Sequence, residues 1–586
     1  MCGIFGYVGA KNNAALMTLE GLKLLEYRGY DSWGIAVKTK GKLVVDKHTG
    51  KIGEAKTVLP QSTIGIGHTR WATHGGVTVK NAHPHMDCTR EIAVIHNGII
   101  ENFLPLKKDL EKKGHVFISE TDTEVFAHLV EEYRKTEPFS KSVRKAFNKI
   151  KGLNGIVALD ASADEIIAAK TGSPLIVGKG QDGYYIASDS SGILPHTKEL
   201  LFLKDNEMVI LGKTFTLLSL PNGDRLTPEF VKVDWKIQDS TKGAHKHFMI
   251  KEISEQPKVV RNIAENYHDQ IENLARVISI AKGTFFIGSG TAFHACLVGT
   301  YLFSKIVKKH VNTAVASEFN YLEHFLNNRS LVIALSQSGE TIDVVEPLVR
   351  AKQKRSKVFA ITNVLGSTIY RLADYKMLLG AGPEKAVAST KAYIAKISLL
   401  LLLSYAMIGE YKKGKEMLLL AADEIERLLR EEYIREFKKI ATVLNKTEHI
   451  YTIGRGFSYP TCLEAALKIK EVSYVHTEGL AGGELKHGTL ALISPGTPCI
   501  VFAPQDETYE AIISNATEIK ARGGVIIGVS PFRSEIFDYW IEVKDIGDAT
   551  LIPMAIPAQL LGYFLAVKKD LDPDKPRNLA KSVTVK

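Results

Sequence analysis

Apolar residues in the first third of the chain follow two different periods, and each period predicts a different kind of element. Four short apolar runs predict buried strands, at Ile4–Val8, Ile35–Val37, Ile64–Gly67 and Ile92–Ile95. Between the first two runs, leucines at positions 16, 19, 22 and 25 recur on one helical face, which predicts a helix over Ala14–Leu25. Another helix is expected to open at Ser119–Glu124, where hydroxyl and acidic side chains favour an amino-terminal cap.

From Glu252 onward the pattern changes to apolar strands that alternate with helical stretches, and it occurs twice. The strand at Phe285–Gly290 ends in Gly-x-Gly, and so does its counterpart at Tyr451–Gly456. Val358–Ile361 and Val525–Gly528 repeat at nearly the same offset. This alternation predicts two doubly wound parallel α/β domains. Neither Gly-x-Gly turn has the third glycine of a dinucleotide site, so such a cofactor is not expected.

The composition shifts suggest five segments. A first domain is expected over residues 2–220, and the turn-rich, polar stretch 221–250 after it is interpreted as a linker. The two repeated α/β domains are placed at 275–414 and 438–577, followed by a carboxyl-terminal tail at 578–586.

Composition narrows the class of protein. The 586 residues are too many for one core, and 24% charged with 45% hydrophobic residues is ordinary for a globular chain. The net charge of +10 is spread without a long basic run, so it suits small anionic substrates and does not indicate nucleic acid. The apolar run Ile397–Ile408 is too short to cross a bilayer, and no basic-then-apolar signal peptide opens the chain, so no membrane is expected.

The cysteine count bears on compartment and metal. Five cysteines are few, odd in number and without Cys-x-x-Cys spacing. This pattern favours a reducing, cytoplasmic compartment and argues against a structural zinc site. No metal and no redox cofactor is expected.

Cys2 is the first candidate for chemistry. Removal of Met1 would leave its thiol and α-amine on one Cα, and the amine, with a usual pKa of about 7.7–8.0, can act as general base for the thiol. The alternative is a small apolar residue at the start of a buried strand.

Amide hydrolysis by this thiol needs three further groups. Asn97 and the backbone of Gly98 can supply two N–H donors to an oxyanion at a strand end. Arg70 offers a two-pronged cation for a carboxylate, and Asp122 an anion for an ammonium group. Taken singly, Arg70 and Asp122 are explained as well by a surface ion pair and a helix cap.

Six segments together resemble the class II glutamine amidotransferases in order and spacing: Cys2–Ile4, Tyr27–Ser32, His68–Gly75, Asn81–His85, His96–Asn102 and Thr121–Glu124. The resemblance implies an αββα fold of the Ntn-hydrolase type, with Cys2 as nucleophile and Asn97 and Gly98 as the oxyanion pair. Arg70, Thr73, His74 and Asp122 take the glutamine-binding positions, and Trp71 that of the gating tryptophan. Trp33 and the short loop 76–78 depart from the family pattern, and the sequence offers no account of Trp33.

The first α/β copy has the better anion site. Its strand Leu331–Leu335 ends in Ser-Gln-Ser-Gly-Glu-Thr at 336–341, where hydroxyls and free N–H groups at a helix start can hold a phosphate. A capped serine turn is the alternative. The matching stretch of the second copy, Phe502–Thr508, is acidic and lacks the serine pair, so only the first copy is expected to hold phosphate.

The second copy carries the candidate acid–base groups. Glu464, Lys468 and Glu471 lie at helical spacing, and His487 follows in Gly-Glu-Leu-Lys-His-Gly. The alternatives are ion pairing on an exposed helical face and a structural histidine.

These stretches resemble the tandem sugar isomerase (SIS) domains of the glutamine:fructose-6-phosphate amidotransferase family. The resemblance covers essentially the whole chain and assigns sugar-phosphate binding to Thr291, Ser336, Gln337, Ser338, Thr341, Val387 and Ser389. It gives acid–base positions to Glu471, Lys468 and His487, and the Schiff-base lysine to Lys581. Two departures are Ala292, where relatives have a phosphate-contacting serine, and Thr489, where they usually have proline.

The resemblance implies amide-nitrogen transfer from L-glutamine to fructose 6-phosphate with isomerisation, in a homodimer. Ammonia released at Cys2 would travel inside the protein to the sugar. Two other interpretations remain open: an amidotransferase with a different sugar-phosphate acceptor, which Ala292 favours, and a sugar-phosphate sensor without synthase activity, which the intact candidate groups oppose.

Overall fold

The computed structural model describes residues 2–233 and 242–583, and these form two compact units. The amino-terminal unit comprises residues up to 240 together with the tail from Ala580, and the carboxyl-terminal unit runs from 241 to 579. Residues 234–241 of the expected linker and 584–586 of the expected tail lie outside the described residues.

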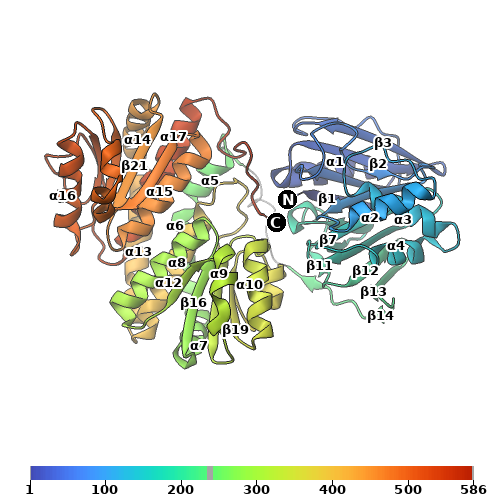
Figure 1. Cartoon of the computed structure of the whole chain (residues 1–586), viewed down its shortest axis with the longest axis horizontal. Helices are drawn as coiled ribbons and strands as arrows, with labels where there is room; N and C mark the ends of the chain where they lie inside the picture. Colours follow the sequence, from blue (N-terminus) through green and yellow to red (C-terminus); the bar gives the residue numbers. More distant parts are fainter. Residues whose placement is uncertain (1, 234–241, 584–586) are drawn as a thin grey trace. The chain divides into compact units, whose positions relative to one another are not determined.

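The amino-terminal unit is built on two antiparallel sheets (Figure 1). The first has the order β15 (Val231–Lys232), β11 (Glu199–Phe202), β9 (Ile176–Lys179), β10 (Gly183–Ala187), β1 (Gly3–Gly9), β4 (Ile64–Arg70), β2 (Ser32–Thr39) and β3 (Lys42–Thr49). The second has the order β14 (Arg225–Leu226), β13 (Phe215–Ser219), β12 (Glu207–Leu211), β8 (Ile166–Thr171), β7 (Asn154–Asp160), β6 (Ile92–Asn97) and β5 (His85–Met86). The helices are α1 (Ala14–Leu25), α2 (Phe103–Lys112), α3 (Glu124–Arg134) and α4 (Phe139–Phe147).

Side-chain alternation along the strands explains the layers. In β1, Ile4 and Val8 pack between the two sheets, whereas Phe5 and Tyr7 point to the other face and contact the buried side of α1. The outer face of the second sheet is covered by α3 and α4 in the same way. The unit is therefore the expected αββα sandwich, and the predicted helix over Ala14–Leu25 is confirmed.

The amino-terminal unit continues past its expected end near Leu220. The short strand β14 pairs with β13, and β15 pairs with β11, so the polar stretch after Pro221 adds an edge to each sheet. The sequence pattern did not indicate these strands because they have two residues each and their side chains are exposed.

The carboxyl-terminal unit holds two five-stranded parallel sheets of the same topology. Their orders are β17 (Asn312–Val315), β16 (Gly283–Gly288), β18 (Ser330–Ser336), β19 (Lys357–Thr362), β20 (Tyr375–Leu378), and β22 (His476–Ala481), β21 (His449–Gly454), β23 (Pro498–Phe502), β24 (Val525–Ser530), β25 (Tyr539–Glu542). The helices are α5 (Phe248–Ser254), α6 (Gln256–Asn266), α7 (His268–Ile280), α8 (Thr291–Leu302), α9 (Ala316–Leu322), α10 (Ile342–Gln353), α11 (Thr368–Leu372), α12 (Lys391–Met407), α13 (Tyr411–Leu428), α14 (Glu431–Leu444), α15 (Ser458–Ser473), α16 (Tyr509–Lys520) and α17 (Ala555–Lys568).

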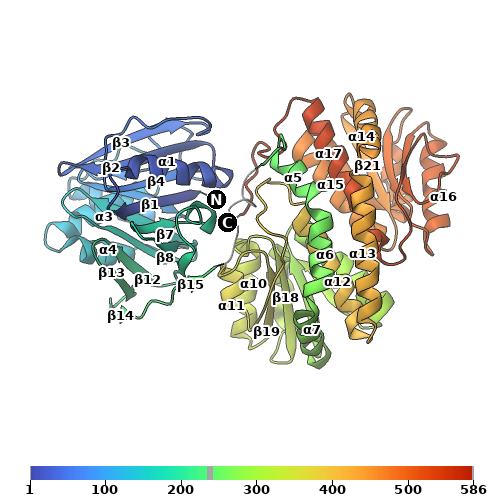
Figure 2. The ribbon, with the colours of Figure 1, turned by 180° about the vertical axis from the view of Figure 1, so that it is seen from behind.

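The two α/β domains share one hydrophobic core. One face of each sheet contributes to it, together with α6, α12, α13, α15 and α17, and Figure 2 shows α6 and α13 running side by side. The opposite faces are covered separately, by α9, α10 and α11 on the first sheet and by α16 on the second. Each sheet is therefore covered on both faces, as expected for doubly wound domains.

The apolar run that contains Ile397–Ile408 is the buried core helix α12, as predicted. Within the described residues, one helical stretch, Gly547–Lys568, is long and apolar enough to span a membrane by composition, but 89% of its apolar window is buried, which is typical of a core helix.

Candidate functional site

Cys2 lies immediately before β1, where three neighbouring segments contact it, and one of them supplies Arg28 Nε, which donates to the Cys2 carbonyl oxygen at 3.3 Å. The backbone N–H of Trp71 donates a hydrogen bond to Cys2 Sγ at 3.2 Å, and Asn97 Nδ2 donates to the Cys2 carbonyl oxygen at 2.9 Å. Burial raises the pKa of the Cys2 thiol. The thiol is therefore protonated near neutral pH and needs a base before it can attack a carbonyl.

The amide of Asn97 is oriented by a buried histidine. His68 Nε2 lies 2.9 Å from the His96 carbonyl oxygen and 3.1 Å from Asn97 Oδ1. Both partners are acceptors, so Nε2 carries the hydrogen, and burial keeps the ring neutral by lowering the pKa of His68 to about 3. Because His68 holds the amide oxygen, the amide nitrogen faces Cys2.

Gly98 completes the candidate oxyanion pair. Its φ is +131°, and a Cβ at this position would lie 2.3 Å from the Leu153 carbonyl oxygen. Only glycine fits both this backbone angle and the available space. The backbone N–H next to Asn97 therefore has an orientation that depends on glycine at position 98.

Arg70, predicted to bind the glutamine carboxylate, holds the loop that follows it. Its NH1 donates to the Gly76 carbonyl oxygen at 3.1 Å, and its NH2 donates to Gly75 at 3.0 Å and to His74. Thr73 is exposed and His74 half-buried on this loop, whose N–H at Gly76 also donates to Glu120 at 3.3 Å. Thr73 and His74 therefore lie on a loop whose backbone carbonyl groups are held by the Arg70 guanidinium.

Asp122 lies on the same side of the sandwich, just before α3. Its Oδ2 accepts a hydrogen bond from the backbone N–H of Ile100 at 2.7 Å, and the side chain is buried. The Arg70 guanidinium interacts electrostatically with both Cys2 and Asp122. The structure thus brings Cys2, Arg70, Asn97 and Asp122 into one neighbourhood.

Trp33, for which the sequence offered no account, is a packing residue. It lies on β2 opposite Thr69, is 4% exposed, and stacks on His48 with ring centroids 4.4 Å apart. Its ring belongs to the core between α1 and the first sheet.

In the first α/β copy, the Ser336–Thr341 turn begins at the last residue of β18 and leads directly into α10, as predicted. Ser336 Oγ accepts from the Gly339 N–H at 2.9 Å, and Gly339 has a φ of +67° that favours glycine. Thr341 caps α10 without a side-chain hydrogen bond to the helix backbone. The turn sits at the carboxyl edge of a parallel sheet, where anions bind in this fold class.

Thr291 does not join this turn. Its Oγ1 donates to Glu464 Oε1 at 3.0 Å, and His294 Nδ1 lies 2.7 Å from Glu464 Oε2. Glu464 also lies 3.5 Å from Lys468 Nζ. These bonds join α8 of the first copy to α15 of the second, so Thr291 has a structural partner in addition to its predicted role.

Lys468 is buried between carboxylates and not on an exposed face. Burial lowers its pKa, but the neighbouring Glu471 and Glu464 outweigh that effect and the net shift is upward. Lys468 therefore remains an ammonium group at neutral pH, which suits an electrostatic role and not a nucleophilic one.

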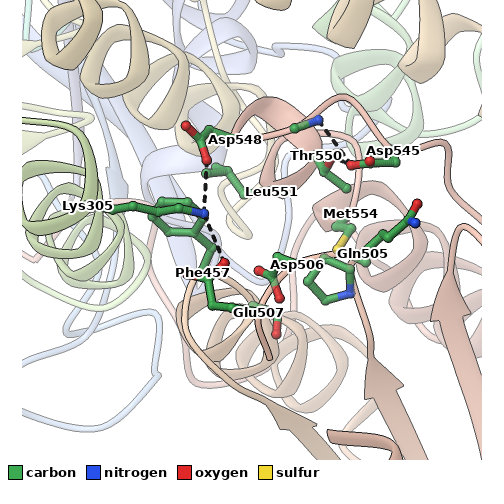
Figure 3. Close-up of a pocket in the computed structure, with 13 residues that line it drawn as sticks. Lys305, Phe457, Gln505, Asp506, Glu507, Asp545, Asp548, Thr550, Leu551 and Met554 are labelled. Atoms are coloured by element: carbon green, nitrogen blue, oxygen red, sulfur yellow. Dashed lines mark hydrogen bonds and ion pairs between the residues drawn. The ribbon is translucent and has the colours of Figure 1, made fainter. Parts of the chain in front are cut away.

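The matching turn of the second copy opens onto an acidic pocket of about 200 Å³ (Figure 3). Asp506, Glu507, Asp545 and Asp548 line it, and Lys305 lies 3.2 Å from both Glu507 Oε2 and Asp548 Oδ1. Since its one lysine is already paired and the carboxylates outnumber it, this pocket repels a phosphate.

The remaining predicted residues lie apart from these contacts. His487 ends a 3₁₀ turn (Gly482–His487) with its side chain exposed, and among the described residues no hydrogen bond or ion pair joins it to Glu471. Val387 is buried, Ser389 Oγ donates to Glu384 Oε2 at 2.9 Å, and Gln337 is half-buried after β18. Lys581 belongs to the tail that groups with the amino-terminal unit.

Comparison with known proteins finds both kinds of domain. A family model described as a glutamine amidotransferase domain matches residues 68–195, and one described as a SIS domain matches residues 278–406 and again 443–532. A solved carboxyl-terminal domain of glucosamine-fructose-6-phosphate aminotransferase from Francisella tularensis is 30% identical, with a TM-score of 0.54, and the match covers 57% of this chain and 99% of that chain.

Curated relatives match over the full length. Glutamine–fructose-6-phosphate aminotransferase [isomerizing] of Pyrococcus horikoshii is 44% identical, and that of Methanothermobacter thermautotrophicus is 41% identical, each over 100% of both chains. The chain therefore belongs to the isomerising glutamine–fructose-6-phosphate aminotransferase family.

Proposed function

We propose that the chain transfers the amide nitrogen of L-glutamine to D-fructose 6-phosphate, giving L-glutamate and D-glucosamine 6-phosphate, the first step of hexosamine synthesis. The observation that carries the proposal is the arrangement at Cys2, which lies immediately before β1 and whose carbonyl oxygen accepts a hydrogen bond from an Asn97 amide that His68 orients. Full-length similarity to enzymes of that name supports the acceptor.

In the glutaminase half-reaction, the Cys2 thiol loses its proton to its own α-amine and attacks the glutamine amide carbon. Asn97 Nδ2 and the Gly98 N–H stabilise the tetrahedral oxyanion. As this intermediate collapses, the α-ammonium group returns its proton to the amide nitrogen, the C–N bond breaks and ammonia leaves. Water then hydrolyses the thioester to glutamate. Arg70, Thr73, His74 and Asp122 bind the amino-acid end of glutamine, and Trp71 closes over it.

In the sugar half-reaction, the Ser336–Thr341 turn holds the phosphate with Val387 and Ser389 beside the sugar. His487 opens the furanose ring, and Lys581 forms an imine at C2 of the open ketose with loss of water. Ammonia from the glutaminase half-reaction then replaces the Lys581 amine at C2, and Glu471 moves the proton between C1 and C2. The charged state of Lys468 supports Lys581 as the imine-forming amine, because an ammonium group between two carboxylates cannot attack a carbonyl.

Ala292 supports a second candidate function, in which the amide nitrogen is transferred to a different sugar phosphate. It lies at the start of α8 and has no hydroxyl to offer the phosphate. A lost hydrogen bond of this kind costs about 1 kcal/mol, which is too little to remove activity but enough to change the order of preference between similar sugar phosphates.

Two further properties belong to the proposal, the compartment and the oligomeric state. The five cysteines are free, which suits a cytoplasmic enzyme. The homodimer is carried over from the family resemblance alone.

The test separates the two half-reactions in matched variants. Cys2→Ala should lose glutamine hydrolysis and glutamine-dependent synthesis, yet still bind and isomerise fructose 6-phosphate. Lys581→Arg keeps the charge but cannot form an imine, so it should lose synthesis while glutamine is still hydrolysed. Borohydride treatment of the unmodified enzyme with fructose 6-phosphate should trap an adduct on Lys581.

Product analysis with glutamine and a panel of ketose and aldose phosphates identifies the acceptor. Glucosamine 6-phosphate as main product supports the proposal, and a different amino sugar phosphate selects the rival acceptor. Glutamine hydrolysis that survives Cys2→Ala, or an adduct mapped to Lys468, would overturn the residue assignment.

A further inference from the structure

Four unlike donor atoms converge on the outer side of the amino-terminal unit: Cys88 Sγ, His115 Nδ1, His128 Nδ1 and a Glu131 carboxylate oxygen, all within 4.8 Å of one another. We call these residues the four-ligand cluster. We propose that the four-ligand cluster is a structural zinc site.

Three segments of the chain supply the ligands. Cys88 lies in the turn between β5 and β6, and His115 lies in the loop that follows α2. His128 and Glu131 are one helical turn apart on α3, where i, i+3 spacing places both on the same face. The side chains of His115 and His128 are 3% and 1% exposed, so the two nitrogens are held in fixed positions at the edge of the core.

The spacing of the donor atoms is close to that of tetrahedral zinc, with the carboxylate oxygen somewhat nearer to the two nitrogens and one sulfur–nitrogen separation somewhat longer. Zinc bonds of about 2.0–2.1 Å to nitrogen or oxygen and about 2.3 Å to sulfur place tetrahedral ligands roughly 3.3–3.6 Å apart. The two Nδ1 atoms are 3.4 Å apart, and Cys88 Sγ lies 3.6 Å from His128 Nδ1 and 3.9 Å from His115 Nδ1. Glu131 Oε2 lies 2.9 and 3.1 Å from the two nitrogens.

Neighbouring groups of the protein orient the side chains of the four-ligand cluster. His115 Nε2, the nitrogen that points away, lies 3.2 Å from Glu132 Oε2, and His128 Nε2 lies 3.7 Å from Glu124 Oε1. The backbone N–H of Val116 donates to Cys88 Sγ at 3.4 Å. A carboxylate behind each histidine and an N–H on the sulfur are the usual supports of metal-bound imidazole and thiolate.

The ligand set selects the metal. One thiolate, two imidazoles and one carboxylate in tetrahedral geometry suit Zn²⁺, while Mg²⁺ and Ca²⁺ prefer six or more oxygen ligands. All four positions come from the protein, which is typical of a structural site and leaves none for a reacting water. Binding needs the Cys88 thiolate and unprotonated Nδ1 atoms, so protons are released as the metal enters.

A zinc ion in the four-ligand cluster would also restrain Asp122, one of the proposed glutamine-binding residues. Glu124 Oε1 and Oε2 accept from the N–H groups of Ile118 and Ser119 at 2.8 and 2.7 Å, and Asp122 stands between this segment and α3. A metal that ties α3 to the β5–β6 turn therefore also limits the movement of Asp122. This consequence depends on the proposed function, but the zinc site does not.

The test measures metal in the full-length chain. Cys2→Ala serves as the parent, because a free amino-terminal cysteine can itself chelate zinc. After incubation with zinc and removal of excess, elemental analysis should find about one zinc per chain, and the cobalt form should show a tetrahedral spectrum with a thiolate charge-transfer band. Cys88→Ala and Glu131→Gln, added singly, should lose zinc at least tenfold more readily to a chelator.

Matched variants complete the design. Cys499→Ala removes a buried cysteine of the other unit and should keep the zinc stoichiometry. Glu132→Gln removes only the support behind His115 and should weaken zinc affinity about 10–100-fold. Zinc below about a tenth per chain after reconstitution, a cobalt spectrum without the thiolate band, or full zinc retention by both Cys88→Ala and Glu131→Gln would overturn the proposal.

Discussion

Single buried charges connect the two α/β copies at the residue scale. Glu464 accepts hydrogen bonds from Thr291 and His294 of the first copy and lies 3.5 Å from Lys468 on its own helix. Glu464 is 1% exposed and Lys468 is fully buried. A buried ammonium group is tolerated only while its carboxylate partners remain, so each of these residues depends on the others.

Removal of the Glu464 carboxylate should therefore destabilise the carboxyl-terminal unit. Glu464→Ala leaves Lys468 with one partner and Thr291 and His294 without their acceptor, and we expect a loss of about 3 kcal/mol in the free energy of unfolding. Calorimetry of that unit's transition measures it. The control is Glu436→Ala, which breaks an exposed pair with Lys439 and should cost less than about 1 kcal/mol. Equal effects of the two changes would contradict this account.

At the scale of elements, the same strand–turn–helix unit occurs in both copies but carries different chemistry. After β18 the turn offers Ser336, Ser338 and Thr341 at the start of α10. After β23 the corresponding residue Thr508 already donates to Asp506 Oδ1 at 2.6 Å, inside the acidic pocket. The fold supplies two equivalent turns, and the side chains allow an anion at one of them.

This difference predicts an asymmetric response to hydroxyl removal. A hydrogen bond to a charged phosphate contributes about 1.5–3 kcal/mol, so Ser338→Ala and Thr341→Ala should each raise the KM for fructose 6-phosphate about 10–100-fold. Basal glutamine hydrolysis should stay nearly constant, because Cys2 and its partners lie in the other unit. Thr508→Ala is the matched control and should leave the KM unchanged. Equal losses from both copies would mean that the phosphate is misplaced.

At the scale of the whole molecule, the two units differ in how many histidines have a pKa that burial lowers. In the amino-terminal unit, burial lowers the pKa of His68 to about 3 and lowers the pKa values of His83 and His96. In the described part of the carboxyl-terminal unit, His247 is the histidine with a lowered pKa, again through burial. Acid should therefore weaken the two units unequally.

The free energy of unfolding depends on pH because the folded and unfolded chains bind different numbers of protons. Below pH 6.5 the unfolded chain binds protons at these histidines and the folded unit does not, so the free energy of unfolding falls as pH falls. Each fully shifted histidine contributes roughly 1.4 kcal/mol per pH unit. Hydrogen exchange at pH 7 and 5.5, corrected for the intrinsic rates, should show protection lost in β4 and β6 before β18 and β23. His83→Asn should make the pH dependence shallower, and equal loss in both units would contradict the prediction.

Local patterns along the sequence determined much of this protein. The leucine spacing placed the helix Ala14–Leu25, the doubled strand–Gly-x-Gly pattern gave two parallel sheets of equal topology, and the motif segments marked Cys2 and Asn97. The predictions of the helix and of the two sheets succeeded because helical and strand periods are properties of neighbouring residues.

Only the tertiary structure decided which distant side chains meet and which are buried. The spacing of Glu464, Lys468 and Glu471 was compatible with an exposed helical face. In the structure α15 packs against α8 and α17, and Glu464 and Lys468 are buried. Strands β14 and β15 are too short to form a pattern and exist through pairing with β13 and β11. The cysteines argued against a structural zinc site because they are few, odd in number and without Cys-x-x-Cys spacing. The proposed ligands Cys88, His115, His128 and Glu131 lie in three separate segments. Their donor atoms converge only because a turn, a loop and a helix pack together at one edge of the sandwich.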